Sequence, residues 1–97
     1  MTDKNTDDNT IFIGSKPFMN YVTGIVMQFN TKKMEEVIIS SRGKFISKAV
    51  DVAEVVRKKF LKDLNLKIKE IKIDSQEFEV KDGKKVTVST MDLTLAK

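Results

Sequence analysis

Two short apolar runs, each followed by a stretch of helical periodicity, constrain the fold of this chain more than any other feature. The runs cover residues 11–13 and 37–39 and suit buried strands. Residues 18–30 and 44–61 repeat apolar side chains every three or four positions, which is typical of helices packed on a core. Strand-helix-strand units almost always make right-handed crossovers, so both helices should cover one face of one sheet.

The chain beyond these helices predicts a long β-hairpin. Apolar residues alternate with polar ones on both sides of Asp82-Gly83, a dipeptide typical of tight hairpin turns. The alternation slips once before the turn, between Ile68 and Ile71, and once after it, which indicates a bulge or a change of face. A strand of about 14 residues would span about 45 Å, so part of the hairpin should project beyond the shorter strands as an arm.

The predicted element order is therefore βαβαββ. We expect an α/β protein of the α+β two-layer type, with a mixed four-stranded sheet, two helices on one face and an extended hairpin arm. Residues 10–97 should form a single domain, and residues 1–9, which are polar and acidic, should form a disordered leader. A chain of 97 residues that is 40% hydrophobic can support one core without a metal or disulfide.

The composition excludes large classes of chemistry. The chain has no Cys and no His, which removes most zinc sites, thiol nucleophiles and imidazole bases. Ser41 and Lys44 formally match an S-x-x-K pattern, but the partner signatures of that enzyme class are missing. We expect no catalysis, no cofactor and no metal. No segment suits a signal peptide or a membrane helix, so we expect an intracellular protein without a membrane partner.

Positive charge gathers in three places that could bind a polyanion. The first ten residues hold one basic and three acidic side chains, so the other 87 carry a net charge of +6. One basic group opens the second helix, where free N–H groups and the helix dipole favour an anion. A second precedes the first helix, and both loops follow parallel strands, whose carboxyl ends meet at one sheet edge. The third is the hairpin tip. The candidate residues are Ser15, Lys16, Arg42, Gly43, Lys44, Lys48, Lys81, Lys84 and Lys85.

Each of these groups could instead be a solvated surface, and the sequence alone leaves that alternative open. The basic residues at the end of the second helix suit the helix C-terminal dipole without any partner. Phe60 lies among them and is either a last core residue or an exposed aromatic covered by another copy of the chain. Taken alone, the residues favour the core position.

Phe12 belongs to a segment that looks like the first-strand motif of an RNA recognition motif, in which an aromatic ring stacks on a base. That family needs a second motif on a strand, whereas Arg42-Gly43-Lys44 opens a helix here, and the element order also differs. We therefore expect Phe12 in the core.

Three segments together resemble the Alba family, the small basic chromatin proteins of archaea that bind DNA and RNA. They are residues 13–22 (IGSKPFMNYV), 41–51 (SRGKFISKAVD) and 88–90 (VST). The resemblance runs from about residue 11 to residue 97. It implies a homodimer whose basic loops grip phosphates, through Lys16, Arg42, Lys44 and Lys48, and whose hairpin arms reach the minor groove with Lys84 and Lys85.

The resemblance has three further implications. An aromatic residue at the position of Phe60 implies contacts between dimers along DNA. Many relatives have two lysines before Pro17, one of them a target of acetylation; here Ser15 replaces the first, so Lys16 is the candidate for modification. Because each phosphate contact contributes about −0.9 to the slope of log affinity against log salt, we expect a shallower salt dependence than in two-lysine relatives.

The sequence thus predicts an architectural chromatin protein of the cytoplasm that coats and condenses the chromosome as dimers, with little sequence preference, and also binds RNA. One alternative is a protein that mainly binds RNA. A more distant alternative is a small-molecule or protein interaction module whose basic groups are only solvated.

Overall fold

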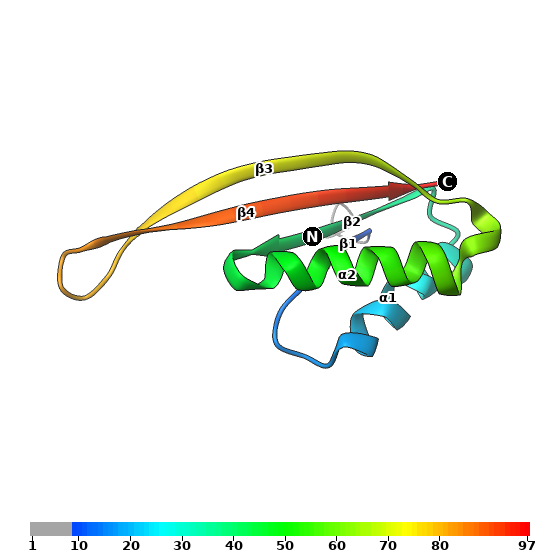
Figure 1. The fold of residues 1–97 in the computed structure, drawn as a ribbon, viewed down its shortest axis with the longest axis horizontal. Helices are drawn as coiled ribbons and strands as arrows, with labels where there is room; N and C mark the ends of the chain where they lie inside the picture. The colour runs from blue at the N-terminus through cyan, green and yellow to red at the C-terminus, as the bar shows by residue number, and fades with distance from the viewer. Residues whose placement is uncertain (1–8) are drawn as a thin grey trace.

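The computed structural model describes residues 9–97 and has the predicted element order (Figure 1). Residues 1–8 of the expected leader lie outside this described part, whereas Asn9 already accepts a hydrogen bond from the Ile38 amide. The main elements are β1 (Thr10–Phe12), α1 (Phe18–Asn30), β2 (Glu36–Arg42), α2 (Ile46–Val55), β3 (Lys67–Glu79) and β4 (Lys85–Ala96). A 3-10 turn at Gly43–Phe45 precedes α2, and a π-helical turn at Val56–Phe60 follows it.

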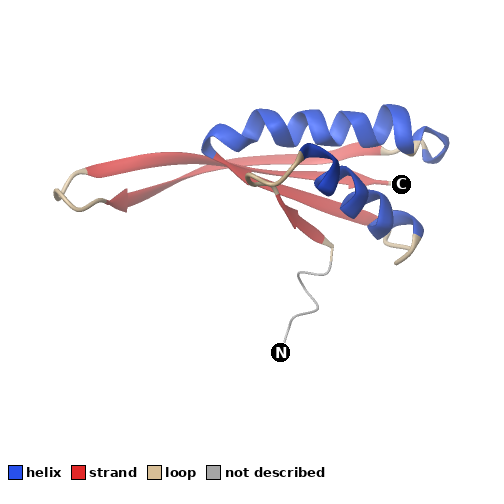
Figure 2. Cartoon of the chain, turned by 90° about the horizontal axis from the view of Figure 1, so that it is seen from below, coloured by secondary structure: helices blue, strands red, loops and turns tan. Residues whose placement is uncertain are grey.

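The four strands form one mixed sheet in the order β1-β2-β4-β3, which confirms the predicted fold class. β1 is parallel to β2, and β4 is antiparallel to both β2 and β3. Both helices lie on the same side of the sheet in Figure 1, and Figure 2 views the molecule from that side. The other face of the sheet carries no helix from residues 9–97, and we call it the helix-free face.

The β3–β4 hairpin extends beyond the ends of β1 and β2, as the strand lengths predicted. β2 pairs with β4 only from Ala96 to Thr90. Beyond Thr90 the strands pair only with each other, residues 75–79 of β3 with residues 85–89 of β4. This two-stranded part, which we call the arm, projects from the body and contributes to a longest molecular dimension of 50 Å (Figures 1 and 2).

The two slips in the hairpin pattern have different structural causes. The pairing register shifts between Ile68 and Glu70, which confirms a bulge in β3. No shift is recorded in β4, where Val88 and Met91 pair in one continuous ladder. Side chains alternate faces along a strand, so the apolar positions of β4 change from the helix-free face to the helical face.

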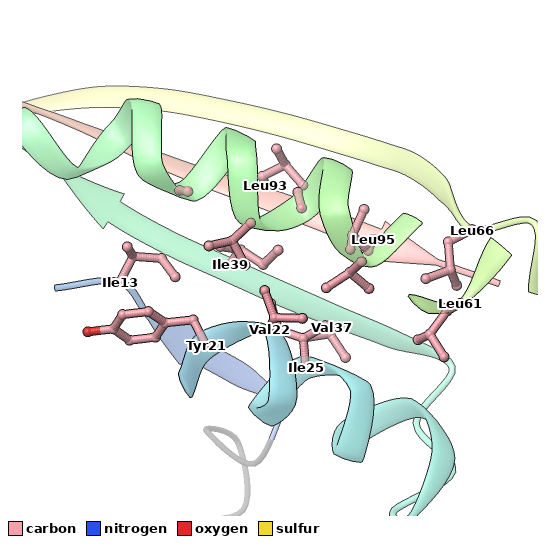
Figure 3. Packing of buried hydrophobic residues seen from close by; sticks show 14 of the residues in the cluster. Ile13, Tyr21, Val22, Ile25, Val37, Ile39, Leu61, Leu66, Leu93 and Leu95 are labelled. Atoms are coloured by element: carbon pink, nitrogen blue, oxygen red, sulfur yellow. The ribbon is translucent and has the colours of Figure 1, made fainter. Parts of the chain in front are cut away.

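The core lies between the helices and the sheet. α1 contributes Val22 and Ile25 (Figure 3) together with Phe29, and each is at most 1% exposed. Val37 and Ile39 from β2 meet them, since alternate residues of that strand point to the helical face. Burial of side chains of this size stabilises the fold by about 1.5–3 kcal/mol each. The core therefore fixes the positions of the loops after β1 and β2.

Two aromatic residues, Phe12 and Phe60, are exposed, and only Phe12 was expected in the core. Phe12 is 67% exposed, because alternation along β1 directs its neighbours Ile11 and Ile13 towards the helices and Phe12 to the helix-free face. The prediction that Phe12 lies in the core is wrong. It assumed that a continuous apolar run is covered on both faces of the sheet, whereas the helices cover only one. Phe60 is 51% exposed in the π-helical turn. This excludes the core alternative and agrees with the exposed aromatic that the resemblance implies.

Candidate nucleic-acid interface

The loop between β1 and α1 is fastened to both helices. The Tyr21 hydroxyl of α1 accepts hydrogen bonds from the backbone N–H groups of Gly14 and Lys16, each at 3.0 Å. The Lys48 ammonium of α2 donates to the carbonyl oxygens of Gly14 at 2.7 Å and Lys16 at 2.6 Å. The same ammonium lies 5.0 Å from the centre of the Tyr21 ring, within cation–π range. The structure thus brings Lys16 and Lys48 together, as the parallel strands predicted.

Lys48 and Lys16, which the sequence predicted to have the same phosphate-binding role, are placed differently in the structure. Lys48 is half-buried, and two of its three N–H donors hold the loop. Lys16 is exposed and forms no ion pair with another residue of the described range 9–97. Lys48 therefore acts first as a positioning residue, whereas the Lys16 side chain, like that of Ser15, points to solvent.

The entrance of α2 depends on a glycine. Gly43 has a φ of +55°, a left-handed conformation that side chains rarely adopt, and it starts the 3-10 turn into α2. This turn follows directly after the last residue of β2, Arg42, and presents the exposed Lys44. The Lys44 ammonium lies 5.4 Å from the centre of the Phe45 ring. Lys44 thus stands at the same end of the sheet as Lys16.

Arg42 connects this cationic end to the arm. Its guanidinium donates a hydrogen bond of 2.6 Å to the Gln76 side-chain oxygen of β3 and lies 5.1 Å from the centre of the Phe78 ring. Because planar guanidinium groups keep several donors, Arg42 retains N–H groups for another partner. Sequence reasoning missed Gln76 and Phe78, since their meeting with Arg42 depends on the register across three strands.

The hairpin tip forms a second cationic area. Lys81, Lys84 and Lys85 are all exposed around a turn in which Gly83 has a φ of +78°. The turn is closed by hydrogen bonds from the Val80 amide to the Lys84 carbonyl and from the Gly83 amide to the Val80 carbonyl. The arm extends from the sheet end at which Arg42 pairs with Thr90, so the tip lies beyond the basic loops rather than beside them.

The basic residues after α2 behave differently. Arg57 forms an ion pair with Glu54 at 2.9 Å and also donates to the Leu66 carbonyl. The hydrogen bond from Arg57 holds the pKa of the Glu54 carboxyl below its ordinary value. Arg57 is thus paired within the fold, whereas Lys58, Lys59 and Lys62 are exposed. The cluster lies at the opposite end of α2 from Lys44, and its interaction with the helix dipole stays a prediction.

Within residues 9–97, no three His, Cys, Asp or Glu side chains gather as a metal site would require. No helix in that range is long and apolar enough to cross a membrane. The arrangement shown by the described residues is a set of cations around one end of a sheet, with a second group at the tip of its arm.

Comparison with known proteins decides the family. The Alba family pattern matches residues 9–75. The chain belongs to the Alba family. It is 44% identical over 90 residues to the DNA/RNA-binding protein Alba of Methanococcus maripaludis. This match covers 93% of this chain and 99% of that protein. It is 46% identical over 90 residues to the DNA/RNA-binding protein Alba 1 of Archaeoglobus fulgidus, covering 93% and 97%.

The Alba fold is matched as well. Alba from Thermoplasma volcanium, a solved structure, superposes with a TM-score of 0.82 at 46% sequence identity. The match covers 92% of this chain and 100% of that chain. This chain therefore shares both sequence and architecture with these relatives over nearly its whole length.

Proposed function

We propose that this Alba-family protein binds duplex DNA with little sequence specificity, coats and condenses it as dimers, and also binds RNA. The observation that carries the proposal is that Lys16, Arg42, Lys44 and Lys48 all lie at the end of the sheet from which the arm projects, with Arg42 on the helix-free face. Its relatives' names, DNA/RNA-binding protein Alba, support the same activity.

The proposed mechanism is electrostatic and involves no chemistry on the nucleic acid. Exposed Lys16 and Lys44 would neutralise phosphates and release condensed counterions, which gives affinity without sequence information. Arg42 would place its remaining donors on the backbone at the foot of the arm. Lys84 and Lys85, at the tip of the arm, would contact the duplex at a second place, away from the first set of contacts.

A homodimer is supported by the exposed edge of the sheet. β3 is an edge strand, and Ile71 and Ile73 are 55% and 76% exposed on it. Both pair with residues whose side chains enter the core, so they point to the helical face of the sheet. Exposed apolar side chains on an edge strand favour contact with another chain. We therefore assign this edge to the interface between subunits.

Two further residues have proposed roles. Phe60, exposed beside Lys58 and Lys59, would make the contact between neighbouring dimers on DNA. Lys16 is accessible enough for acetylation, which would remove one phosphate-binding charge per subunit. With these roles on DNA, the protein would act in the cytoplasm in association with the chromosome.

The test replaces two exposed cations that hold no part of the fold. Lys16→Ala with Lys44→Ala removes four cations per dimer, so the slope of log affinity against log salt should become shallower by about 3.6. The matched control is Lys32→Ala with Lys97→Ala, two exposed lysines at the opposite end of the molecule and outside the β3 edge. An unchanged slope in the first variant, or an equal loss in both, would contradict the proposed interface.

A further inference from the structure

The helix-free face of the sheet contains a hollow of about 290 Å³ at its basic end. Phe12 of β1, Ser40 and Arg42 of β2, Thr90 and Asp92 of β4, and Gln76 of β3 line it, so all four strands contribute. The phosphate contacts proposed above use none of these residues except Arg42. The hollow is just below the range of about 300–1,000 Å³ that is typical of small-molecule sites.

One row of paired residues builds the hollow. Phe12 pairs with Ser40 across β1 and β2, and Ser40 pairs with Asp92 across β2 and β4. Paired residues point to the same face, so the Phe12 ring, the Ser40 hydroxyl and the Asp92 carboxylate stand side by side. The ring is 67% exposed although the rest of its strand is at least partly buried, which leaves a large apolar surface available beside polar groups.

The polar groups of the hollow are held in place. The Ser40 hydroxyl donates to one Asp92 carboxylate oxygen at 2.7 Å, so the other oxygen still accepts. Arg42 donates a hydrogen bond to the Gln76 side-chain oxygen, so the Gln76 amide N–H groups remain free to donate to a ligand. A flat apolar surface, a fixed carboxylate acceptor and fixed donors therefore converge within one small site.

This chemistry suits a nucleobase and does not suit a phosphate. Arg42 lines one side of the hollow and Lys72 pairs with Asp92 across β3 and β4, so the site is not uniformly acidic. At the Asp92 side, however, a second anion would meet a carboxylate, whereas the exocyclic amine of cytosine would find a good acceptor there. Unpaired bases stack on aromatic rings of open sheets and use their edges for hydrogen bonds, while a paired base hides its faces inside the duplex. Arg42 at the rim and Lys16 in the adjacent loop would hold the flanking phosphates.

We propose that the hollow binds one unpaired nucleobase of a single-stranded nucleic acid, stacked on Phe12, with cytosine preferred over uracil through Asp92. The inference rests on the proposed function for its phosphate contacts and adds to it a site that duplexes cannot fill. Uracil presents a carbonyl oxygen where cytosine presents an amine, so the Asp92 carboxylate would disfavour it.

The test measures the affinity of short C-rich and U-rich single strands, as RNA and as DNA, beside a duplex of equal length. Phe12→Leu should weaken single-strand binding by about 5- to 100-fold and leave duplex binding within about twofold, because the stacking surface is lost and the cations remain. Met27→Leu, at another exposed apolar residue, is the control and should change neither. Asp92→Asn should reduce a preference for cytosine of about tenfold.

A fluorescent cytosine analogue in the single strand gives an independent readout of stacking. Its emission should be quenched by the original protein and by the double variant of Lys16 and Lys44 at saturation, but not by Phe12→Leu. Equal single-strand affinity and quenching in Phe12→Leu would overturn the site. Duplex binding without any single-strand binding would overturn it and leave the proposed function standing, whereas binding to neither would overturn both.

Discussion

Tyr21→Phe is the sharpest probe of how the basic loop is held. The substitution keeps the ring, which is 7% exposed in the core and lies against Lys48, and removes only the hydroxyl. Two partly buried backbone N–H groups, those of Gly14 and Lys16, then lose their acceptor. A net hydrogen bond contributes about 0.5–1.5 kcal/mol, so the loss of two should lower the free energy of unfolding by about 1–3 kcal/mol.

The same variant should weaken nucleic-acid binding without changing its salt dependence. No cation is removed, so the number of released counterions and the salt slope should stay the same. A loosened loop must be ordered on binding, so the affinity should fall at every salt concentration. Denaturant unfolding at fixed protein concentration and duplex titrations at several salt concentrations measure the two effects. Wild-type stability together with wild-type affinity would refute the anchoring role of the hydroxyl.

Three other substitutions test separate features. Gln28→Met should raise the free energy of unfolding by about 1 kcal/mol, because the buried Gln28 side-chain oxygen has no hydrogen-bond partner within residues 9–97; denaturant unfolding checks this. Gly43→Ala should lower it by about 1–2 kcal/mol because φ is +55°, a conformation that strains any residue with a side chain, while the added methyl would make only an ordinary contact with Val88 at 3.5 Å; thermal melting shows the effect. Glu54→Gln should destabilise at neutral pH and not in acid: the Arg57 contact lowers the folded pKa of Glu54, so its contribution is present above the ordinary pKa and disappears as pH falls through the folded value. The melting temperatures of Glu54→Gln and of the unsubstituted protein should therefore differ at neutral pH and become equal as the pH falls.

The sequence was sufficient for the elements whose signals are local. The slip between Ile68 and Ile71 marked the β3 bulge, and the unequal strand lengths predicted the arm. Gly14 and Gly43 marked the two loops that meet at the basic end. Each of these signals depends on residues close together in the chain, so no knowledge of packing was needed.

Other features depended on contacts between distant segments. The exposure of Phe12 follows from which face the helices cover, and a three-residue apolar run carries no sign of that choice. The Arg42–Gln76 contact requires the register of three strands. Tyr21 belongs to the apolar stripe of α1, and only its hydroxyl indicated a polar partner. Such contacts become visible only when the sheet is assembled.

The most direct test of the central claim is a titration of the purified protein with several duplexes of unrelated sequence and equal length, at a series of salt concentrations. The proposed interface predicts similar affinities for all sequences and a linear, steep fall of log affinity with log salt, by about 0.9 for each phosphate contacted. Negligible binding at low salt, or affinity that ignores salt, would contradict it.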